Sequence, residues 1–291
     1  MSQRRYGYAR VETCEGAVGL LSEGAVASRL LAGGTDLLVL VHKEGATWDR
    51  LIDISRVAEM RAITEEAGAI IVGAAATHAE IAADALIRQT LPALAEACQS
   101  VGSPQIRNRG TVGGNIANAA ACADTLPALV CLGAVARVVT PEGETEIPVG
   151  DFVTGVNRTI LPAASVIRDF RIPKPAAGTQ MAFVKLGRRQ AQAISRLSLA
   201  CLGRLDATGR VADLRVTPGA CTSQTQRFDA AEAILLGQTP TEELVRKAGA
   251  AAAAQMVEIA GRRWSTAYKE PALTALVERG LRRVLGLAEV K

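Results

Sequence analysis

The chain has 291 residues, of which 49% are apolar and 21% are charged, and its formal net charge is +4. This composition is that of a globular protein and excludes a disordered chain, while the modest charge and an aromatic content of 3% exclude a basic surface for nucleic-acid binding. Because one domain typically holds roughly 100–200 residues, the length predicts two or three domains.

The sequence also bears on location. No apolar run reaches the roughly 18 residues needed to cross a bilayer, and the opening residues do not continue into a signal-like apolar segment. Six cysteines are widely spaced without a CxxC pair, which is typical of free thiols in a reducing compartment. We therefore expect a cytoplasmic protein without a membrane span. The cysteines are Cys14, Cys98, Cys122, Cys131, Cys201 and Cys221.

Residues 1–55 are predicted to form a small unit in which strands and helices alternate. Asp36 would lie at the positive end of the second helix dipole. The expected elements are strands at 6–11, 28–31 and 51–54 and helices at 12–22 and 36–42.

A second unit is predicted over residues 56–175. Thr77 and Glu80 have the spacing of a capping box, which indicates a helix start. The proline-rich segment 173–178 is the clearest linker of the chain. The other expected elements are strands at 69–74, 134–139 and 167–172 and a helix at 91–101.

After the linker the pattern changes to consecutive strands followed by helices, which predicts a third domain over residues 178–288. Thr239-Pro240-Thr241-Glu242 combines a capping box with proline at the first helical position, so a helix is expected to begin there. Residues 271–287 carry an apolar stripe and predict an amphipathic closing helix. The expected strands are 181–186, 195–205 and 211–216.

Two glycine pairs are the most informative feature of the chain. Gly33-Gly34 follows an apolar strand, and Gly113-Gly114 lies further along, between Val112 and an asparagine. Because glycine has no Cβ, the backbone at such a pair can approach a ligand closely, and its N–H groups can form a concave anion site. The two pairs indicate a pyrophosphate held from two sides, as in a flavin dinucleotide. The alternative is that both are tight turns.

Several other sites are excluded. The chain has no G-x-G-x-x-G fingerprint and no glycine followed by lysine, so it lacks the Rossmann and Walker motifs. With only His42 and His78, a histidine-rich metal site or a catalytic triad is not expected, and His78 is interpreted as a residue of a first helical turn. Cys122 and Cys131 are too few for an iron–sulfur cluster and are interpreted as buried thiols.

The segments 31–37 (Leu-Ala-Gly-Gly-Thr-Asp-Leu) and 106–116 resemble the two FAD loops of the flavin subunit of molybdenum hydroxylases. This is the family of xanthine dehydrogenase and carbon monoxide dehydrogenase, in which the piece is called the medium subunit. The resemblance extends over essentially the whole chain. It implies an α+β fold, with a PCMH-type FAD-binding module of two α/β subdomains at 1–55 and 56–175, and a C-terminal α/β domain at 178–288.

The resemblance also implies how the pyrophosphate would be held. The first segment would wrap it with the backbone N–H groups of residues 33–36, and the second would complete the cradle with the Thr111 hydroxyl and the Asn115 side chain. Hydrogen bonds to a charged phosphate are each worth roughly 1.5–3 kcal/mol. The residues implied for this part are Leu30, Leu31, Ala32, Gly33, Gly34, Thr35, Asp36, Leu37, Thr111, Val112, Gly113, Gly114 and Asn115.

Four further residues match positions around the rest of FAD. Val101 would lie beside the adenosine, and Asp124 would accept a hydrogen bond from an FAD hydroxyl. Ile167 would pack on the isoalloxazine, and Lys185 would lie near the flavin. Without the resemblance, Asp124 is a helix N-cap, Ile167 a core residue and Lys185 a solvated charge on a strand edge.

The implied function is electron transfer without a catalytic or metal-binding residue on this chain. A large molybdenum-cofactor subunit would oxidise the substrate, and a small 2Fe–2S subunit would pass the electrons to FAD on this chain. FAD would then reduce NAD⁺ or another acceptor, in a dimer of heterotrimers. Two alternatives stay open: a self-sufficient flavin-dependent oxidoreductase of the related fold, and an FAD-free scaffold subunit.

Overall fold

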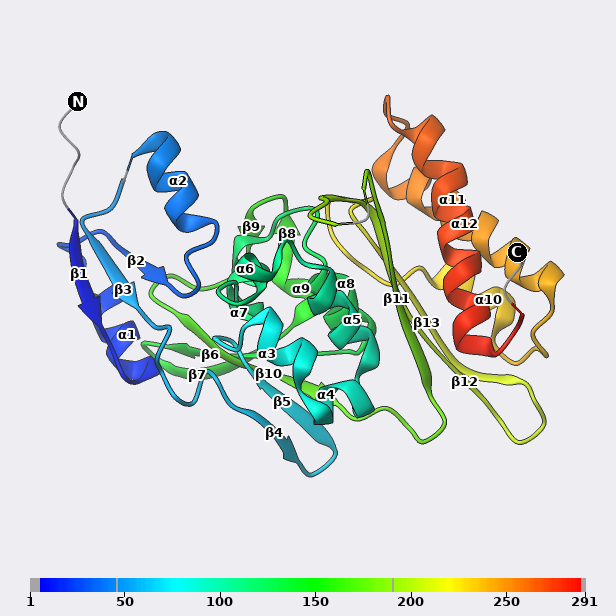
Figure 1. Ribbon diagram of the computed structural model, residues 1–291, viewed down its shortest axis with the longest axis horizontal. Coiled ribbons are helices and arrows are strands. Elements are labelled where there is room, and N and C mark those ends of the chain that lie inside the picture. The colour runs from blue at the N-terminus through cyan, green and yellow to red at the C-terminus, as the bar shows by residue number, and fades with distance from the viewer. Residues whose placement is uncertain (1–5, 46, 190, 289–291) are drawn as a thin grey trace.

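The computed structural model describes residues 6–45, 47–189 and 191–288. The fold is α+β, and three sheets follow one another along the long axis of the molecule (Figure 1). From one end to the other, they are a three-stranded parallel sheet, a five-stranded antiparallel sheet and a three-stranded antiparallel sheet.

The parallel sheet comes from the beginning of the chain. β1 (Gly7–Arg10) and β2 (Ser28–Leu31) both pair in parallel with the central strand β3 (Arg50–Asp53). Parallel pairing needs crossover connections, and α1 (Cys14–Leu21) and α2 (Leu37–Glu44) lie in them. The first glycine pair therefore lies where β2 ends and α2 begins.

The middle sheet is antiparallel throughout, in the order β4-β5-β10-β6-β7. The capping box predicted at Thr77 and Glu80 is present and begins the first helix after β5. The strands are β4 (Ile63–Glu66), β5 (Ala69–Gly73), β6 (Val135–Thr140), β7 (Gly143–Pro148) and β10 (Val166–Pro173), with β8 (Val153–Gly155) and β9 (Arg158–Thr159) in a separate ribbon. The helices are α3 (His78–Ala83), α4 (Ala85–Thr90), α5 (Pro92–Ser100), α6 (Pro104–Arg107), α7 (Val112–Asn118), α8 (Thr125–Cys131) and α9 (Val149–Phe152).

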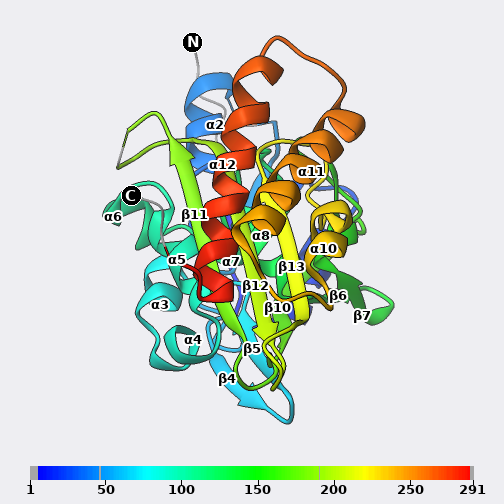
Figure 2. The same cartoon turned by 90° about the vertical axis from the view of Figure 1, so that its right-hand side faces the viewer.

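The third sheet is covered by helices on both faces. On one face α12 packs on its strands, with α11 packed along α12 and α10 on β13 (Figure 2). On the other face α5 and α8 of the middle unit pack against the same strands. The strands are β11 (Gln180–Gly187), β12 (Ser195–Leu205) and β13 (Val211–Gly219), and the helices are α10 (Asp229–Leu235), α11 (Glu242–Ala260) and α12 (Thr266–Leu285).

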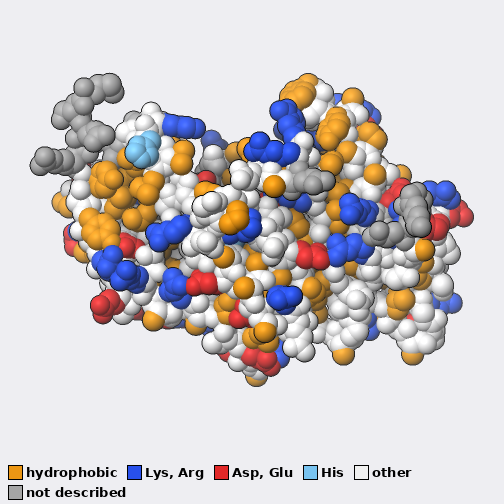
Figure 3. All heavy atoms as spheres, viewed as in Figure 1, with side chains coloured by type: hydrophobic (Ala, Val, Ile, Leu, Met, Phe, Trp, Pro, Cys, Tyr) orange, Lys and Arg blue, Asp and Glu red, His pale blue; other side chains and the backbone are white. Residues whose placement is uncertain are grey.

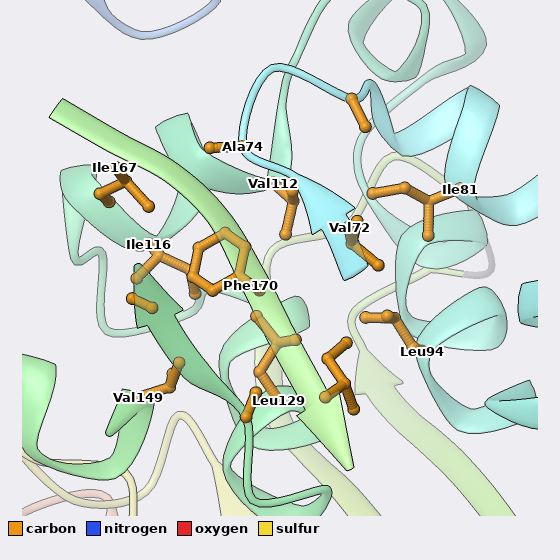
Figure 4. Packing of buried hydrophobic residues seen from close by; sticks show 14 of the residues in the cluster. Val72, Ala74, Ile81, Leu94, Val112, Ile116, Leu129, Val149, Ile167 and Phe170 are labelled. Atoms are coloured by element: carbon orange, nitrogen blue, oxygen red, sulfur yellow. The ribbon is translucent and has the colours of Figure 1, made fainter. Parts of the chain in front are cut away.

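Two apolar clusters hold these layers together. The larger one is continuous from the parallel sheet through the middle sheet to the near face of the third sheet, so the first two predicted subdomains share one core. Within it Phe170 of β10 is fully buried, with Ile116 and Leu129 beside it (Figure 4). The smaller cluster lies between the third sheet and α10–α12. Burial of one Val, Leu, Ile, Phe or Met side chain contributes about 1.5–3 kcal/mol to the free energy of folding.

Two helix starts differ from the prediction. α11 begins at Glu242 with Thr241 as its N-cap, so Pro240 lies outside the helix instead of at its first position. α12 begins at Thr266, and Pro271 lies inside it. An interior proline removes a helical hydrogen bond at a cost of about 3 kcal/mol. The apolar stripe of α12, buried against the third sheet, offsets that cost.

Candidate cofactor-binding site

The two glycine pairs have different local structures. Gly33-Gly34 lies in an irregular segment between β2 and α2. Gly113-Gly114, in contrast, lies in the first turn of α7, whose N-cap is Thr111. The second pair is thus a helix start and not a free loop.

The segments that carry the two pairs contact each other directly. A Cβ on Gly33 would lie 1.9 Å from the carbonyl oxygen of Arg109 and 3.0 Å from the Cα of Gly110. A Cβ on Gly110 would in turn lie 3.5 Å from the Thr35 hydroxyl. Only glycine permits this approach, so the first pair rests on the backbone that leads into the second.

The first pair presents a run of unused backbone donors. Within the described part of the chain, the N–H groups of residues 32–36 donate to no protein atom. Gly34 has a φ of +75°, a left-handed conformation that favours glycine. Residues 32–35 are half-buried and Asp36 is exposed. Consecutive free N–H groups around such a turn form a concave site for an anion, which fits the pyrophosphate of a dinucleotide.

The second pair contributes in another way. The N–H of Gly113 donates to the carbonyl oxygen of Ala74 at 2.8 Å, and that of Gly114 to the Thr111 Oγ1 at 3.1 Å. A Cβ on Gly113 would lie 2.6 Å from the Cβ of Ala74. Both N–H groups are therefore already used, and Gly113 serves close packing of α7 on the end of β5. The donors left for a ligand are the Thr111 hydroxyl and the Asn115 amide.

A hydrogen bond links α7 to a buried charged pair. Asn115 Oδ1 accepts from the Thr125 hydroxyl at 2.6 Å, and Thr125 is the first residue of α8, next to Asp124. Asp124 is the N-cap of α8 by position, but its side chain makes no capping hydrogen bond. It points instead toward the third sheet, where Lys185 Nζ lies 2.6 Å from its Oδ2 and the Ser195 hydroxyl 2.5 Å from its Oδ1.

The ion pair lies at the contact between the middle unit and the third sheet. Asp124 is 6% exposed, and Lys185 also donates to the carbonyl oxygen of Ser100 at 3.0 Å. Lys185 is thus a paired, half-buried side chain and not a solvated charge. Burial raises the pKa of the Asp124 carboxyl above its usual range, although Lys185 and Ser195 act to lower it. The contacts of Asp124 with Lys185 and Ser195 therefore do not fully compensate for the loss of hydration of its carboxylate.

Val101 and Ile167 differ in their relation to this pair. Val101 is the C-cap of α5 and directly follows Ser100, the partner of Lys185. Its carbonyl oxygen accepts from Arg107 Nη1 at 3.0 Å. Ile167 is 5% exposed and belongs to the apolar core on β10. The structure thus brings Val101, Asp124 and Lys185 together. Ile167 instead lies in the apolar core, on β10 of the middle sheet.

Two open hollows of about 420 and 450 Å³ adjoin along α4 and α5, and both are lined by Ala82, Arg88 and Gln99. One of them ends at Ser100 and Lys185. The ion pair is therefore beside a hollow within the usual size range of ligand sites.

His78 also belongs to this region. The sequence predicted it only as a residue of a first helical turn. It is 2% exposed, and its Nδ1 has no hydrogen-bond partner within the described chain. A Cβ on Gly110 would lie 3.3 Å from its ring. His78 therefore supports, from below, the backbone on which Gly33 rests. Burial lowers the pKa of His78 to about 4, and the charge of Arg107 adds to that effect.

This pKa predicts a pH dependence of stability. Between pH 6.5 and 4 the unfolded chain binds a proton at His78 that the folded chain does not, so stability falls as the pH falls through this window. The loss is about 3 kcal/mol when complete. Urea unfolding at pH 7 and pH 4 measures it, and His78→Gln should reduce the difference between the two pH values by that amount. An identical pH dependence in the variant would contradict this assignment.

The cysteines do not form a ligand set. All six are free, and five of them are buried. Cys122 is only half-buried, which corrects the expectation of a fully buried thiol. Burial raises the pKa of Cys131 to about 12 and that of Cys221 to about 11, which keeps them protonated at neutral pH. Within the described residues, no group of three or more histidine, cysteine or acidic side chains could hold a metal ion. None of the helices described there is long and apolar enough to cross a bilayer.

Fold and site together define a class: a mixed α+β protein with a glycine-built, concave run of backbone donors suited to an anion. Two family models match the chain and identify the family within this class. The model of the FAD binding domain in molybdopterin dehydrogenase matches residues 4–175, and that of the CO dehydrogenase flavoprotein C-terminal domain matches residues 182–284. The chain belongs to the family of FAD-binding medium subunits of molybdenum hydroxylases of the xanthine and carbon monoxide dehydrogenase type, and is the FAD component of an oxidoreductase.

Curated relatives and a solved structure agree with this membership. The xanthine dehydrogenase FAD-binding subunit of Escherichia coli O157:H7 is 34% identical over 227 residues, which are 77% of each chain. The carbon monoxide dehydrogenase medium chain of Hydrogenophaga pseudoflava is 31% identical and covers 95% of this chain and 96% of its own. The solved structure of the latter organism's carbon monoxide dehydrogenase, lacking the Mo-pyranopterin moiety of its molybdenum cofactor, matches with a TM-score of 0.90 at 30% identity. It covers 98% of this chain and 99% of that chain.

Proposed function

We propose that this chain transfers electrons through FAD within a heteromeric molybdenum hydroxylase. The observation that carries the proposal is the run of five unused N–H groups at residues 32–36, held against the backbone of Arg109 and Gly110. A double negative charge placed there would meet these donors and the N-terminus of α2, with the exposed Asp36 carboxylate at the rim of the same segment. Membership of the FAD-binding family supports FAD as the occupant.

The other predicted residues would hold the rest of the cofactor. The Thr111 hydroxyl and Asn115 amide are free to donate next to the cradle. Asp124 Oδ2 accepts from Lys185 and its Oδ1 from Ser195, and because each carboxylate oxygen has two lone pairs, Asp124 can accept a further hydrogen bond. Lys185 and Val101 lie beside it, and Ile167 offers an apolar side chain. FAD supplies the redox chemistry, and the residues of this chain bind and orient it.

The names of the relatives support a heteromeric assembly. Several of these are named as parts of larger enzymes, such as the carbon monoxide dehydrogenase medium chain and the alpha subunit of the 6-hydroxypseudooxynicotine dehydrogenase complex of Paenarthrobacter nicotinovorans. We place this chain in a cytoplasmic dimer of heterotrimers. A large molybdenum-cofactor subunit oxidises the substrate, a small 2Fe–2S subunit passes electrons to FAD, and NAD⁺ or another acceptor receives them.

Reconstitution tests the proposal. The purified chain, incubated with FAD and then desalted, is expected to retain about one FAD per chain as measured by flavin absorbance. Retention of no flavin would contradict the cofactor assignment and favour a scaffold subunit. Precipitation with acid then distinguishes the remaining alternative: flavin released to the supernatant agrees with a non-covalent electron carrier, whereas flavin left in the pellet indicates a tethered, self-sufficient oxidoreductase.

A further inference from the structure

The carboxylate of Asp124 is held in one orientation at a buried place. Asp and Glu side chains that reach solvent are scattered over the face of the molecule shown in Figure 3, whereas Asp124 is 6% exposed. Its Oδ2 accepts from Lys185 at 2.6 Å, and its Oδ1 accepts from the Ser195 hydroxyl at 2.5 Å. A carboxylate that is bonded at both oxygens cannot turn about its Cβ–Cγ bond without losing one of these hydrogen bonds.

The two donors constrain this carboxylate differently. Lys185 ends in a point charge on a flexible four-carbon stem, and it also donates to the carbonyl oxygen of Ser100 at 3.0 Å. It therefore supplies charge with little control of angle. Ser195 is 6% exposed and is the first residue of β12, so its short side chain is fixed by the sheet. The direction of the Asp124 carboxylate consequently depends on the serine more than on the lysine.

A β-bulge turns Ser195 toward Asp124. β12 pairs with β11 in a regular register from Leu197 onward, but Arg196 is an extra residue before Ser195 resumes the pairing. Successive side chains of a strand point to opposite faces. Without the bulge, Ser195 would share the face of Leu197, which packs toward the C-terminal helices. The extra residue moves it to the other face, where α8 packs and where its hydroxyl reaches Asp124.

Ser198 shows what another serine of the same strand does. It lies directly opposite Lys185 in the ladder between β11 and β12 and is 1% exposed. Its hydroxyl nevertheless has no hydrogen-bond partner within the described chain. Proximity to Lys185 is therefore not enough to bring a serine of β12 to the carboxylate, and the bulge makes the difference.

We propose that Ser195 is a positioning residue for the cofactor: its hydroxyl orients the Asp124 carboxylate so that a free lone pair faces a hydroxyl group of FAD. This inference rests on the proposed function, in which Asp124 accepts that hydrogen bond. A carboxylate that is already oriented binds without first losing rotational freedom. Removal of the Ser195 hydroxyl should therefore weaken FAD binding, and it should do so through Asp124.

The test measures the affinity of the purified full-length chain for FAD by flavin fluorescence titration. Ser195→Ala removes the hydroxyl and leaves the ion pair in place, and we expect FAD to bind at least about tenfold more weakly. Ser198→Ala is the matched control, because it removes another buried hydroxyl from the same strand, and it should bind FAD as the wild type does. Wild-type affinity of Ser195→Ala, or equal losses in both serine variants, would overturn the proposal.

A double-mutant cycle separates positioning from a merely structural role. In an Asp124→Ala background there is no carboxylate to orient, while the glycine cradle still binds FAD, so Ser195→Ala should weaken binding by less than about twofold. A structural role of Ser195 predicts the same loss with and without Asp124, and that result would contradict the inference. FAD retention by the wild-type chain is measured first: no retention refutes the proposed function and this inference with it, whereas retention with an unaffected Ser195→Ala refutes positioning alone.

Discussion

Gly33→Ala is expected to weaken the binding of FAD by the purified chain while leaving most of the fold intact. The added Cβ would lie 1.9 Å from the Arg109 carbonyl oxygen, which is backbone and cannot rotate away. The two segments must separate, and the unused N–H groups of residues 32–36 lose their common orientation. We expect FAD to bind at least tenfold more weakly, equivalent to about 1.4 kcal/mol or more, as measured by flavin fluorescence titration.

Gly24→Ala is the control for this variant. Gly24 is also a loop glycine of the first unit, but a Cβ there would meet nothing within 4 Å, and its φ is not positive. It should bind FAD as the wild type does. If Gly33→Ala bound FAD with unchanged affinity, the contact between the two segments would have no role in cofactor binding.

Lys185→Met is expected to lower the free energy of unfolding by about 3–5 kcal/mol, because it leaves the buried Asp124 carboxylate without its cation. The double variant Asp124→Asn/Lys185→Met removes both charges and should recover most of that loss. The raised pKa of Asp124 has the same physical origin, since burial penalises its charged form. Urea unfolding of the apo chain at pH 7 measures these changes independently of FAD.

An exposed ion pair provides the comparison. Lys247 and Glu243 are 59% and 68% exposed on α11, and pairs in contact with solvent contribute little to stability. Glu243→Gln should therefore change stability little. If Lys185→Met were equally mild, or if the double variant were less stable than the single one, the pair would not stabilise the contact between the middle unit and the third sheet.

The fold was predictable from the sequence where the signals are local, and not where packing between distant segments decides. The buried strand 69–74 and the capping box at Thr77 were predictable because their signals are local: a run of apolar residues and a fixed spacing. The start of α12 was not, because packing against the third sheet outweighs the local effect of Pro271. The three domain limits stay a prediction, although one core joins the first two segments.

The site shows the same division. The glycine pairs were visible as motifs, and their resemblance to FAD loops identified the family that the comparisons confirm. Their unequal use of backbone donors was not visible, because it depends on Ala74 and Thr111 accepting hydrogen bonds from Gly113 and Gly114. The role of His78 was also hidden, since nothing in its neighbourhood along the chain indicates burial beneath Gly110.

The sequence by itself thus determined the composition class, the alternation of elements and the two motifs that identify an FAD-binding subunit. These are encoded by neighbouring residues and need no knowledge of distant contacts. Only the tertiary structure decided that Gly33 rests on Arg109, that Asp124 pairs with Lys185 across two units, and that a bulge turns Ser195 toward Asp124. Each of these depends on segments that are far apart in the chain, and their distances and burial exist only once the chain has folded.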